Sequence, residues 1–282
     1  ANNPKFLASK DLMSREEIKH LTNSLVDLGI DEIRITGGEP TLRSDFFDIV
    51  NDLSKLELKK LGLTTNGMFT NNTLLKLKNS NCHYINFSLD SLNKDCFLKI
   101  TGTNNLQNVL ESILMAKEMG FYVKVNTVLM KTINDHEIED FVKFSKKYGI
   151  EVRFLELMKI GPARNHFQKY FISADFIIQQ LKQLSNLELV EMAKDSTSFN
   201  FKLKGGANIG LIASESKPFC TSCSRLRLSA SGEIRPCLML NKGISLKNKT
   251  KLEIKEILYK TMALKPAERI YEVDQPMNQI GG

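Results

Sequence analysis

The first 160 residues alternate between two hydrophobic periods. Apolar side chains recur at three- and four-residue spacing from Ile18 to Leu28, and a short apolar stretch follows at 32–36. The same alternation predicts helices over 14–28, 43–54, 71–78, 105–118 and 135–147, and strands over 32–36, 60–64, 83–88, 122–129 and 151–157. Strands and helices that alternate at about 30 residues per unit predict an α/β fold with a parallel sheet and helical crossovers.

The first predicted helix carries its own boundary signals. Ser14 is followed three residues later by Glu17, which is typical of a capping box, and Gly29 follows the last apolar position. No strand is predicted before this helix. The sheet therefore lacks the strand with which such a fold would normally open.

The pattern changes after Gly161 and Pro162. A helix is expected at 173–184, strand-like segments at 187–193, 198–204 and 208–212, and a last helix near 251–260. We therefore expect a domain boundary near residue 160, with an α/β domain over 1–160 and a C-terminal α+β extension over 161–282.

Three cations interrupt strands that should be buried: Arg34, Lys124 and Arg153. A buried cation costs several kcal/mol unless it is paired. Each could meet a carboxylate such as Glu156 or Glu39, or all three could face a shared anionic ligand. Three such residues on strands of one sheet favour the shared ligand.

Three cysteines have the spacing C-x2-C-x13-C, at Cys220, Cys223 and Cys237. Thiolates at this spacing can hold one soft metal centre, and three ligands leave one position open for a substrate or water. Arg225 and Arg227 lie inside the gap and indicate an anionic ligand.

Composition excludes several classes of protein. No apolar run approaches the roughly 20 residues of a membrane span, and the start lacks the apolar core of a secretory signal. Five cysteines in 282 residues make no disulfide scaffold, so a reducing cytoplasm is expected, with Cys82 and Cys96 as inert thiols. The net charge is +7, but its lysines are spread along helix faces, which favours solvated surfaces over nucleic-acid binding.

The loop Gly37-Gly38-Glu39-Pro40 follows a predicted strand. It lacks the Gly-Lys-Ser/Thr ending of a phosphate loop. Its glycines let a ligand approach the backbone, and Glu39 could hold the ammonium group of an amino-acid-like cofactor. Met158 at a strand end could be core or cofactor contact. Ser88 could cap the next helix or bind a ribose, and the sequence leaves both alternatives open.

Together these motifs resemble the radical S-adenosylmethionine (SAM) superfamily and, within it, the GTP 3′,8-cyclases of molybdenum cofactor biosynthesis. The matching segments are 34–40, 64–67, 88–92, 124–126, 153–158, 220–227, Cys237 and 277–282. The Gly-Gly-Glu-Pro loop is general to the superfamily, whereas the cysteine segment with Arg225-Leu226-Arg227 and the terminal Gly281-Gly282 are specific to the cyclases.

The resemblance implies a radical-SAM-type incomplete (β/α)6 partial TIM barrel and a lyase that converts GTP to 3′,8-cyclo-7,8-dihydro-GTP. It implies that SAM is bound by Gly38, Glu39, Ser88 and Met158. It implies that GTP is bound by Arg34, Thr65, Lys124, Arg225, Leu226 and Arg227, with Arg153 as a further candidate. The three C-terminal cysteines would hold an auxiliary 4Fe-4S cluster whose open iron meets the guanine, and Gly281-Gly282 would reach the active site. Its partners would be a second copy of the chain and the downstream cyclic pyranopterin monophosphate synthase.

The sequence departs from the superfamily in one respect. The C-x3-C-x2-C motif that holds the SAM-cleaving 4Fe-4S cluster is absent, and the first cysteine is Cys82. The sequence is therefore either an N-terminally truncated piece or a degenerate relative, and its start without Met favours truncation. We expect the chain as given to be inactive without that segment.

Two other functions stay open at this point. Three cysteines and a carboxylate could hold zinc in a non-catalytic module whose basic groups bind nucleic acid. A peptide-maturing radical SAM enzyme is a further alternative, although such enzymes usually carry more C-terminal cysteines.

Overall fold

The computed structural model describes residues 11–191, 196–240, 242–270 and Val273. It divides into two compact units. The first unit contains Asn66–Thr70 and Asn86–Ser224, and the second contains the described parts of Asn2–Thr65, Asn71–Ile85 and Arg225–Gly282. Strand β3 (Tyr84–Ser88) crosses the division.

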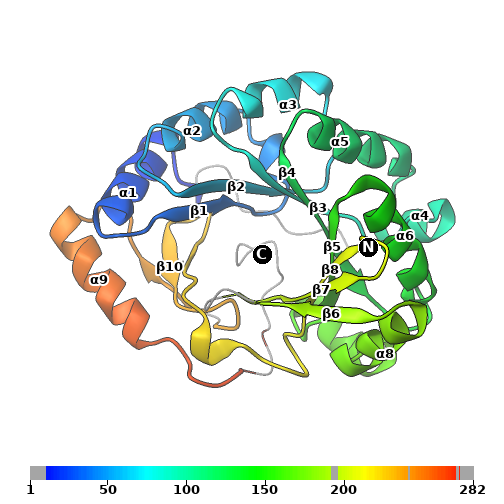
Figure 1. Ribbon diagram of the computed structural model, residues 1–282. Coiled ribbons are helices and arrows are strands. Elements are labelled where there is room, and N and C mark those ends of the chain that lie inside the picture. Colours follow the sequence, from blue (N-terminus) through cyan, green and yellow to red (C-terminus); the bar gives the residue numbers. More distant parts are fainter. Residues whose placement is uncertain (1–10, 192–195, 241, 271–272, 274–282) are drawn as a thin grey trace. The chain divides into compact units, whose positions relative to one another are not determined.

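The first unit is built on a mixed sheet covered by helices. Its strands lie in the order β4 (Tyr122–Leu129), β5 (Glu151–Glu156), β8 (Asn208–Ile212), β7 (Phe199–Leu203) and β6 (Leu187–Val190). Strands β4, β5 and β8 are parallel, and β7 and β6 are antiparallel. Helices α5 (Leu106–Glu118), α6 (Ile138–Tyr148) and α8 (Ala174–Leu184) lie on the outside of this sheet (Figure 1).

Burial alternates along β4 and β5 and gives the sheet two different faces. Val125 and Phe154 are fully buried, and the Phe154 ring meets that of Phe141 on α6 at 6.0 Å between centroids. Lys124 and Arg153 point to the opposite side and are half-buried. We call this second side the polar face of the first unit. Its polar residues are Lys124, Asn126, Glu151, Arg153 and Asn200.

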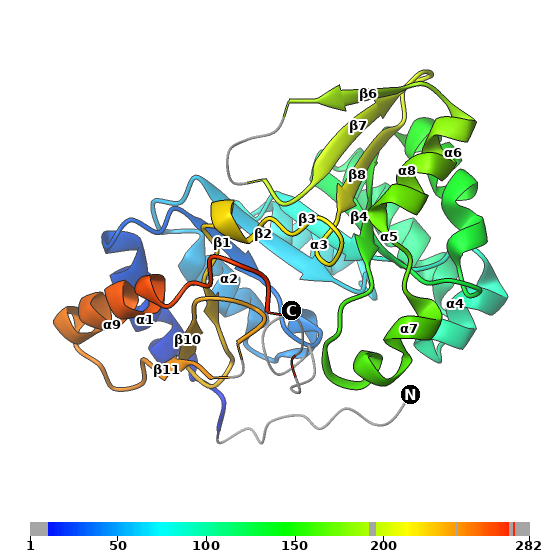
Figure 2. The same ribbon diagram turned by 90° about the horizontal axis from the view of Figure 1, so that it is seen from below.

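The second unit joins the N-terminal elements to the C-terminal segment. It contains the parallel pair β1 (Glu32–Ile35) and β2 (Lys60–Thr65), helices α1 (Arg15–Asp27), α2 (Phe46–Leu53), α3 (Asn71–Lys78) and α9 (Lys251–Ala263), and a small antiparallel sheet of β9 (Arg227–Leu228), β10 (Glu233–Arg235) and β11 (Ile244–Ser245). Leu21 and Leu25 of α1 share a buried cluster with Ile234, Ile254 and Leu258. Helix α9 therefore packs beside α1, as Figure 2 shows.

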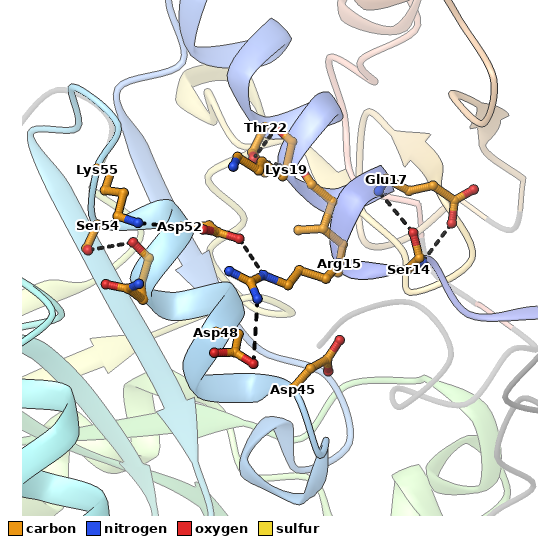
Figure 3. Close-up of polar contacts among 12 residues, drawn as sticks. Ser14, Arg15, Glu17, Lys19, Thr22, Asp45, Asp48, Asp52, Ser54 and Lys55 are labelled. Atoms are coloured by element: carbon orange, nitrogen blue, oxygen red, sulfur yellow. Dashed lines mark hydrogen bonds and ion pairs between the residues drawn. The ribbon is translucent and has the colours of Figure 1, made fainter.

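The capping box predicted for the first helix is confirmed (Figure 3). The Ser14 Oγ accepts a hydrogen bond from the Glu17 amide at 3.1 Å, and the Ser14 amide donates to the Glu17 carboxylate at 2.7 Å. One residue later, Arg15 Nε lies 2.6 Å from Asp52 Oδ2 on α2. This hydrogen bond holds the pKa of Asp52 below its usual value and fixes α1 against α2.

Most predicted elements appear within a few residues of their expected bounds. The expected helix at 43–54 begins only at Phe46, because Pro40 starts a separate 3-10 turn (Pro40–Leu42) and Arg43 is extended. Several elements were not predicted: α4 (Lys94–Thr101), α7 (Phe167–Tyr170), the 3-10 turns Asp135–Glu137, Gly161–His166 and Cys220–Ser222, and strands β9, β10 and β11. Among the described residues, no helix has the length and apolar content needed to cross a bilayer.

Candidate active site

The Gly-Gly-Glu-Pro loop follows β1 in the second unit. Gly37 has φ +152, a value that L side chains rarely adopt, so a glycine is needed there. The Glu39 Oε1 accepts hydrogen bonds from the Thr41 hydroxyl at 2.6 Å and from the Thr65 hydroxyl at 3.0 Å. The structure thus brings Glu39, expected to bind SAM, into contact with Thr65, expected to bind GTP. Both hydroxyls fix the orientation of the carboxylate.

Arg34 lies over a glycine on the neighbouring strand. Arg34 and Gly62 are register partners in the β1–β2 pair, and Arg34 Nη1 donates to the Leu63 carbonyl at 3.1 Å. A Cβ atom at position 62 would lie 3.0 Å from Arg34 Nη2. The missing side chain at Gly62 therefore makes the room that the guanidinium occupies.

The Arg225-Leu226-Arg227 segment is fixed from several sides within the second unit. Leu226 packs against the buried cluster, and Arg227 is the register partner of Arg235 in β10. Lys265 Nζ donates to the Arg225 carbonyl at 2.7 Å and to the Pro236 carbonyl at 3.0 Å. Lys265 thereby links this segment to the residue before Cys237, a role that the sequence did not indicate.

The three expected cluster ligands are half-buried thiols rather than disulfides. The Cys223 amide donates to the Cys220 carbonyl at 3.3 Å, which closes the C-x2-C turn, and the Met239 amide donates to Cys237 Sγ at 3.3 Å. Reduced sulfur atoms, one of which accepts a backbone hydrogen bond, fit an iron–sulfur cluster.

These thiols are divided between the two units. Cys220 and Cys223 belong to the first and Cys237 to the second. Within either unit alone, the residues that the structure describes contain no group of three His, Cys, Asp or Glu side chains that could hold a metal ion. The three-thiolate site therefore stays a prediction.

The other two cysteines have the environments of inert thiols. Burial raises the pKa of Cys82 to about 12. Burial also raises the pKa of Cys96, whose Sγ donates to the Ile133 carbonyl at 3.3 Å. A thiol that stays protonated is a poor metal ligand, so their interpretation as non-ligands agrees with the structure.

Lys124 and Arg153 share one carboxylate on the polar face of the first unit. Lys124 Nζ lies 2.7 Å from Glu151 Oε2, and Arg153 Nε donates to Glu151 Oε1 at 2.6 Å. The sequence had offered Glu156 or Glu39 as examples of a carboxylate partner, and the carboxylate that both cations contact here is Glu151. The register of β4 and β5 places Glu151 opposite Lys124, and it is two residues from Arg153 on the same face.

Glu156 instead points to the buried side, where its side chain binds backbone amides. Its oxygens accept from the amides of Ala174 and Glu215, both at 2.7 Å, and from the Ser216 amide at 2.9 Å; the Ser216 hydroxyl also donates to it. Glu156 therefore joins the end of β5 to the start of α8 and to residues 215–216, and its role is structural.

Ser88 and Asn126 lie next to each other across β3 and β4. The Leu89 amide donates to the Asn126 carbonyl at 2.9 Å, a parallel-strand bond that pairs Ser88 with Asn126. Ser88 is exposed and does not cap the next helix, since that cap is Asn93. The Asn126 Oδ1 is buried without a hydrogen-bond partner among the described residues. Such an orphaned acceptor fits a donor from a bound ligand.

Asp90 holds the loop after β3 against β4. Its Oδ1 accepts from the Val128 amide at 2.8 Å, and Asn134 Nδ2 donates to the Asp90 carbonyl at 2.6 Å. Burial raises the pKa of the Asp90 carboxyl to about 6. At the end of β5, the Met158 carbonyl accepts from the Ile160 amide at 2.9 Å. The expected ligand contacts Gly281 and Gly282 lie outside the described residues.

Comparisons with known proteins agree with these motifs. Residues 3–145 match the radical SAM superfamily, and residues 150–270 match the family Molybdenum Cofactor Synthesis C. A Synechocystis protein named GTP 3′,8-cyclase is 43% identical over 277 residues, which cover 98% of this chain and 85% of the relative. The protein of the same name from Aquifex aeolicus is 39% identical and covers 89% of this chain and 80% of its own length. This chain belongs to the GTP 3′,8-cyclase family.

The structural comparison supports the fold of this cyclase-family chain. The solved structure of Streptococcus suis SuiB aligns with 89% of this chain and 61% of its own, with a TM-score of 0.59 at 17% identity. At that identity the likeness concerns the fold alone. The α/β partial-barrel fold expected from the sequence is confirmed, and the radical SAM family to which the chain belongs uses a 4Fe-4S cluster and SAM.

Proposed function

We propose that this chain binds GTP and converts it, with SAM, into 3′,8-cyclo-7,8-dihydro-GTP, the first step of molybdopterin biosynthesis. The observation that carries the proposal is 43% identity over 98% of the chain to a protein named GTP 3′,8-cyclase. When bound, SAM and the iron–sulfur cluster that cleaves it would supply the radical chemistry of the reaction. The protein binds and orients the two ligands and excludes water.

The proposed SAM residues are Gly38, Glu39, Ser88 and Met158. Glu39 suits the ammonium group of the methionine part, because the hydroxyls of Thr41 and Thr65 hold its carboxylate in place. Ser88 suits the ribose, since it is exposed at a strand end and caps no helix. The orphaned Oδ1 of Asn126 beside Ser88 supports a hydroxyl-bearing ligand at this point.

The proposed GTP residues are Arg34, Thr65, Lys124, Arg153, Arg225, Leu226 and Arg227. Arginine donates in a fork that matches phosphate oxygens or a purine edge, and lysine supplies a compact positive charge. Cys220, Cys223 and Cys237 would hold the auxiliary cluster, whose open iron would meet the guanine. Gly281 and Gly282 would approach the same ligand.

Metal content tests this assignment. After anaerobic reconstitution with iron and sulfide, we expect one 4Fe-4S cluster per chain, and its loss in Cys220→Ser. The matched control is Cys96→Ser, since Cys96 has the raised pKa of a non-ligand thiol. One tightly bound zinc and no iron would contradict the proposal and favour the zinc-stabilised nucleic-acid-binding module.

The C-x3-C-x2-C motif that holds the SAM-cleaving cluster in the family is absent from these 282 residues. We expect GTP conversion once the chain is joined to a segment that supplies this motif, and none without it. Chromatography of the product, with a Cys220→Ser chain as control, measures this. A chain that carries the motif and a full cluster complement but leaves GTP unchanged would contradict the proposed reaction.

Four finer statements accompany the proposal. The chain would act in the cytoplasm, form a homodimer and pass its product to cyclic pyranopterin monophosphate synthase. The expected domain boundary near residue 160 would separate the partial barrel from the C-terminal domain.

A further inference from the structure

Glu151 is the one acidic side chain among the polar residues that define the first unit's polar face. It lies between Lys124, at 2.7 Å, and Arg153, at 2.6 Å, and the three side chains are 20% to 31% exposed. Burial opposes its ionisation, but the charges of Arg153 and Lys124 outweigh that effect, so the pKa of the Glu151 carboxyl lies below its ordinary value. The three groups therefore form an ionised cluster with a net charge of +1.

Arg153 uses little of its hydrogen-bonding capacity in this cluster. Its hydrogen bond with the described residues is made from Nε to Glu151, so both Nη groups keep their donors for another acceptor. Its side chain lies over Gly210, where an added Cβ would come within 2.8 Å of Arg153 Cγ. The missing side chain at Gly210 therefore makes the room that the stem of Arg153 occupies.

Two like charges held this close need an anion between them. Glu151 supplies that anion when no ligand is bound, with Oε2 on Lys124 Nζ and Oε1 on Arg153 Nε. The phosphate oxygens of a nucleotide carry more charge and accept from several donors at once. A polyphosphate can therefore compete with the carboxylate for both cations.

We propose that Glu151 is a built-in counter-ion that occupies Lys124 and Arg153 until the polyphosphate of the substrate displaces it. The inference rests on the proposed binding of GTP and adds to it a residue that weakens phosphate binding. In the ligand-free chain Glu151 keeps the two cations oriented and prevents their mutual repulsion. On binding, the carboxylate gives up both contacts, which lowers the affinity for polyphosphates and leaves that for an uncharged nucleoside unchanged.

The test compares ligands that differ in phosphate content. The full chain, anaerobically reconstituted with iron and sulfide, is titrated with guanosine, GTP and inorganic tripolyphosphate without divalent cations. Glu151→Gln keeps the shape and removes the charge, so it should bind GTP and tripolyphosphate about tenfold more tightly, with guanosine unchanged. The matched control is Glu139→Gln, an exposed carboxylate on α6 paired with Lys143 at 2.8 Å, which should bind all three as the wild type does.

Every outcome of this titration decides the inference. Equal polyphosphate affinity in Glu151→Gln and the wild type overturns it, as does a gain that extends equally to guanosine. If tripolyphosphate binds more tightly to the variant while GTP binds to neither protein, the proposed function is contradicted and the role of Glu151 as a counter-ion is supported. If neither polyphosphate binds either protein, both fail. If Glu151→Gln does not fold, Glu151→Asp replaces it, because its carboxylate is one methylene further from the two cations. Polyphosphate binding tighter than in the wild type then supports the inference, and unchanged binding overturns it.

Discussion

At the scale of single residues, neighbouring side chains determine where the cations of this chain lie. Gly62 has no side chain, and Arg34 occupies the space. Glu151 supplies a carboxylate, and Lys124 and Arg153 meet on it. In both cases a residue with no ligand role of its own orients a cation that we assign to GTP.

Gly62→Ala tests the placement of Arg34. The new Cβ would lie 3.0 Å from the flexible end of the Arg34 side chain, which can move at little cost to stability. We expect nearly unchanged thermal unfolding and GTP binding that is weaker by roughly 1–2 kcal/mol, from the displaced charged contact. Calorimetric titration measures the affinity. GTP binding as tight as in the wild type would show that Arg34 does not contact the nucleotide.

Asp90→Asn tests the buried carboxyl next to Val128. Folding raises its pKa to about 6, so its contribution to stability is fully present below pH of about 4 and is lost as the pH rises through about 6. The asparagine keeps the oxygen that accepts from Val128 and does not titrate. Relative to the wild type, the variant should therefore gain about 1–3 kcal/mol in unfolding free energy between pH 4 and pH 8.

Urea unfolding of both proteins across that pH range measures the difference. A gap between wild type and variant that stays constant from pH 4 to pH 8 would contradict the raised pKa of Asp90.

At the scale of secondary-structure elements, the strongest local signals predicted the structure best. Helix α1 combines a capping box, a regular apolar face and a terminal glycine, and it was found as expected. Helix α4 was missed because only Phe97 of its eight residues is a buried hydrophobic, which gives no clear period. Strands β9 and β11 have two residues each, so they depend on tertiary pairing rather than on local sequence.

The same reasoning separates what could be foreseen in the site from what could not. Lys124 and Arg153 stood out because charges interrupt apolar strands. Their partner Glu151 did not, since it depends on the β4–β5 register, which the sequence leaves undetermined. Lys265 was missed because its contacts with the Arg225 and Pro236 carbonyls cross 40 and 29 residues of sequence.

Glu156→Ala tests whether the Glu156 carboxylate stabilises the junction of β5, α8 and residues 215–216. The substitution leaves the amides of Ala174, Glu215 and Ser216 without their acceptor. Each lost partner costs about 1 kcal/mol or more, so we expect a loss of roughly 3 kcal/mol in unfolding free energy. Glu139→Ala, at an exposed carboxylate of α6, should stay within about 0.5 kcal/mol of the wild type. Equal denaturant midpoints for both variants would contradict the structural role of Glu156.

At the scale of the whole molecule, the net charge of +7 does not identify a ligand, because its lysines are spread along helix faces, whereas membership of the GTP 3′,8-cyclase family indicates GTP. The informative cations are those on strands and in the segment beside the cysteines. The net charge alone does not distinguish them from cations on solvated helix faces. Their number suits a triphosphate better than a monophosphate. The central claim is therefore that this chain binds GTP through the Arg225-Leu226-Arg227 segment.

Equilibrium titration of the reconstituted, anaerobic chain with GTP tests that claim most directly, in the wild type and in Arg225→Ala and Arg227→Ala, with ATP as competitor. The account predicts one GTP per chain, little competition from ATP, and binding weaker by about 1–3 kcal/mol in each variant, because each loses a charged hydrogen bond. GTP affinity that is unchanged in both variants, or no GTP binding by the wild type, would contradict it.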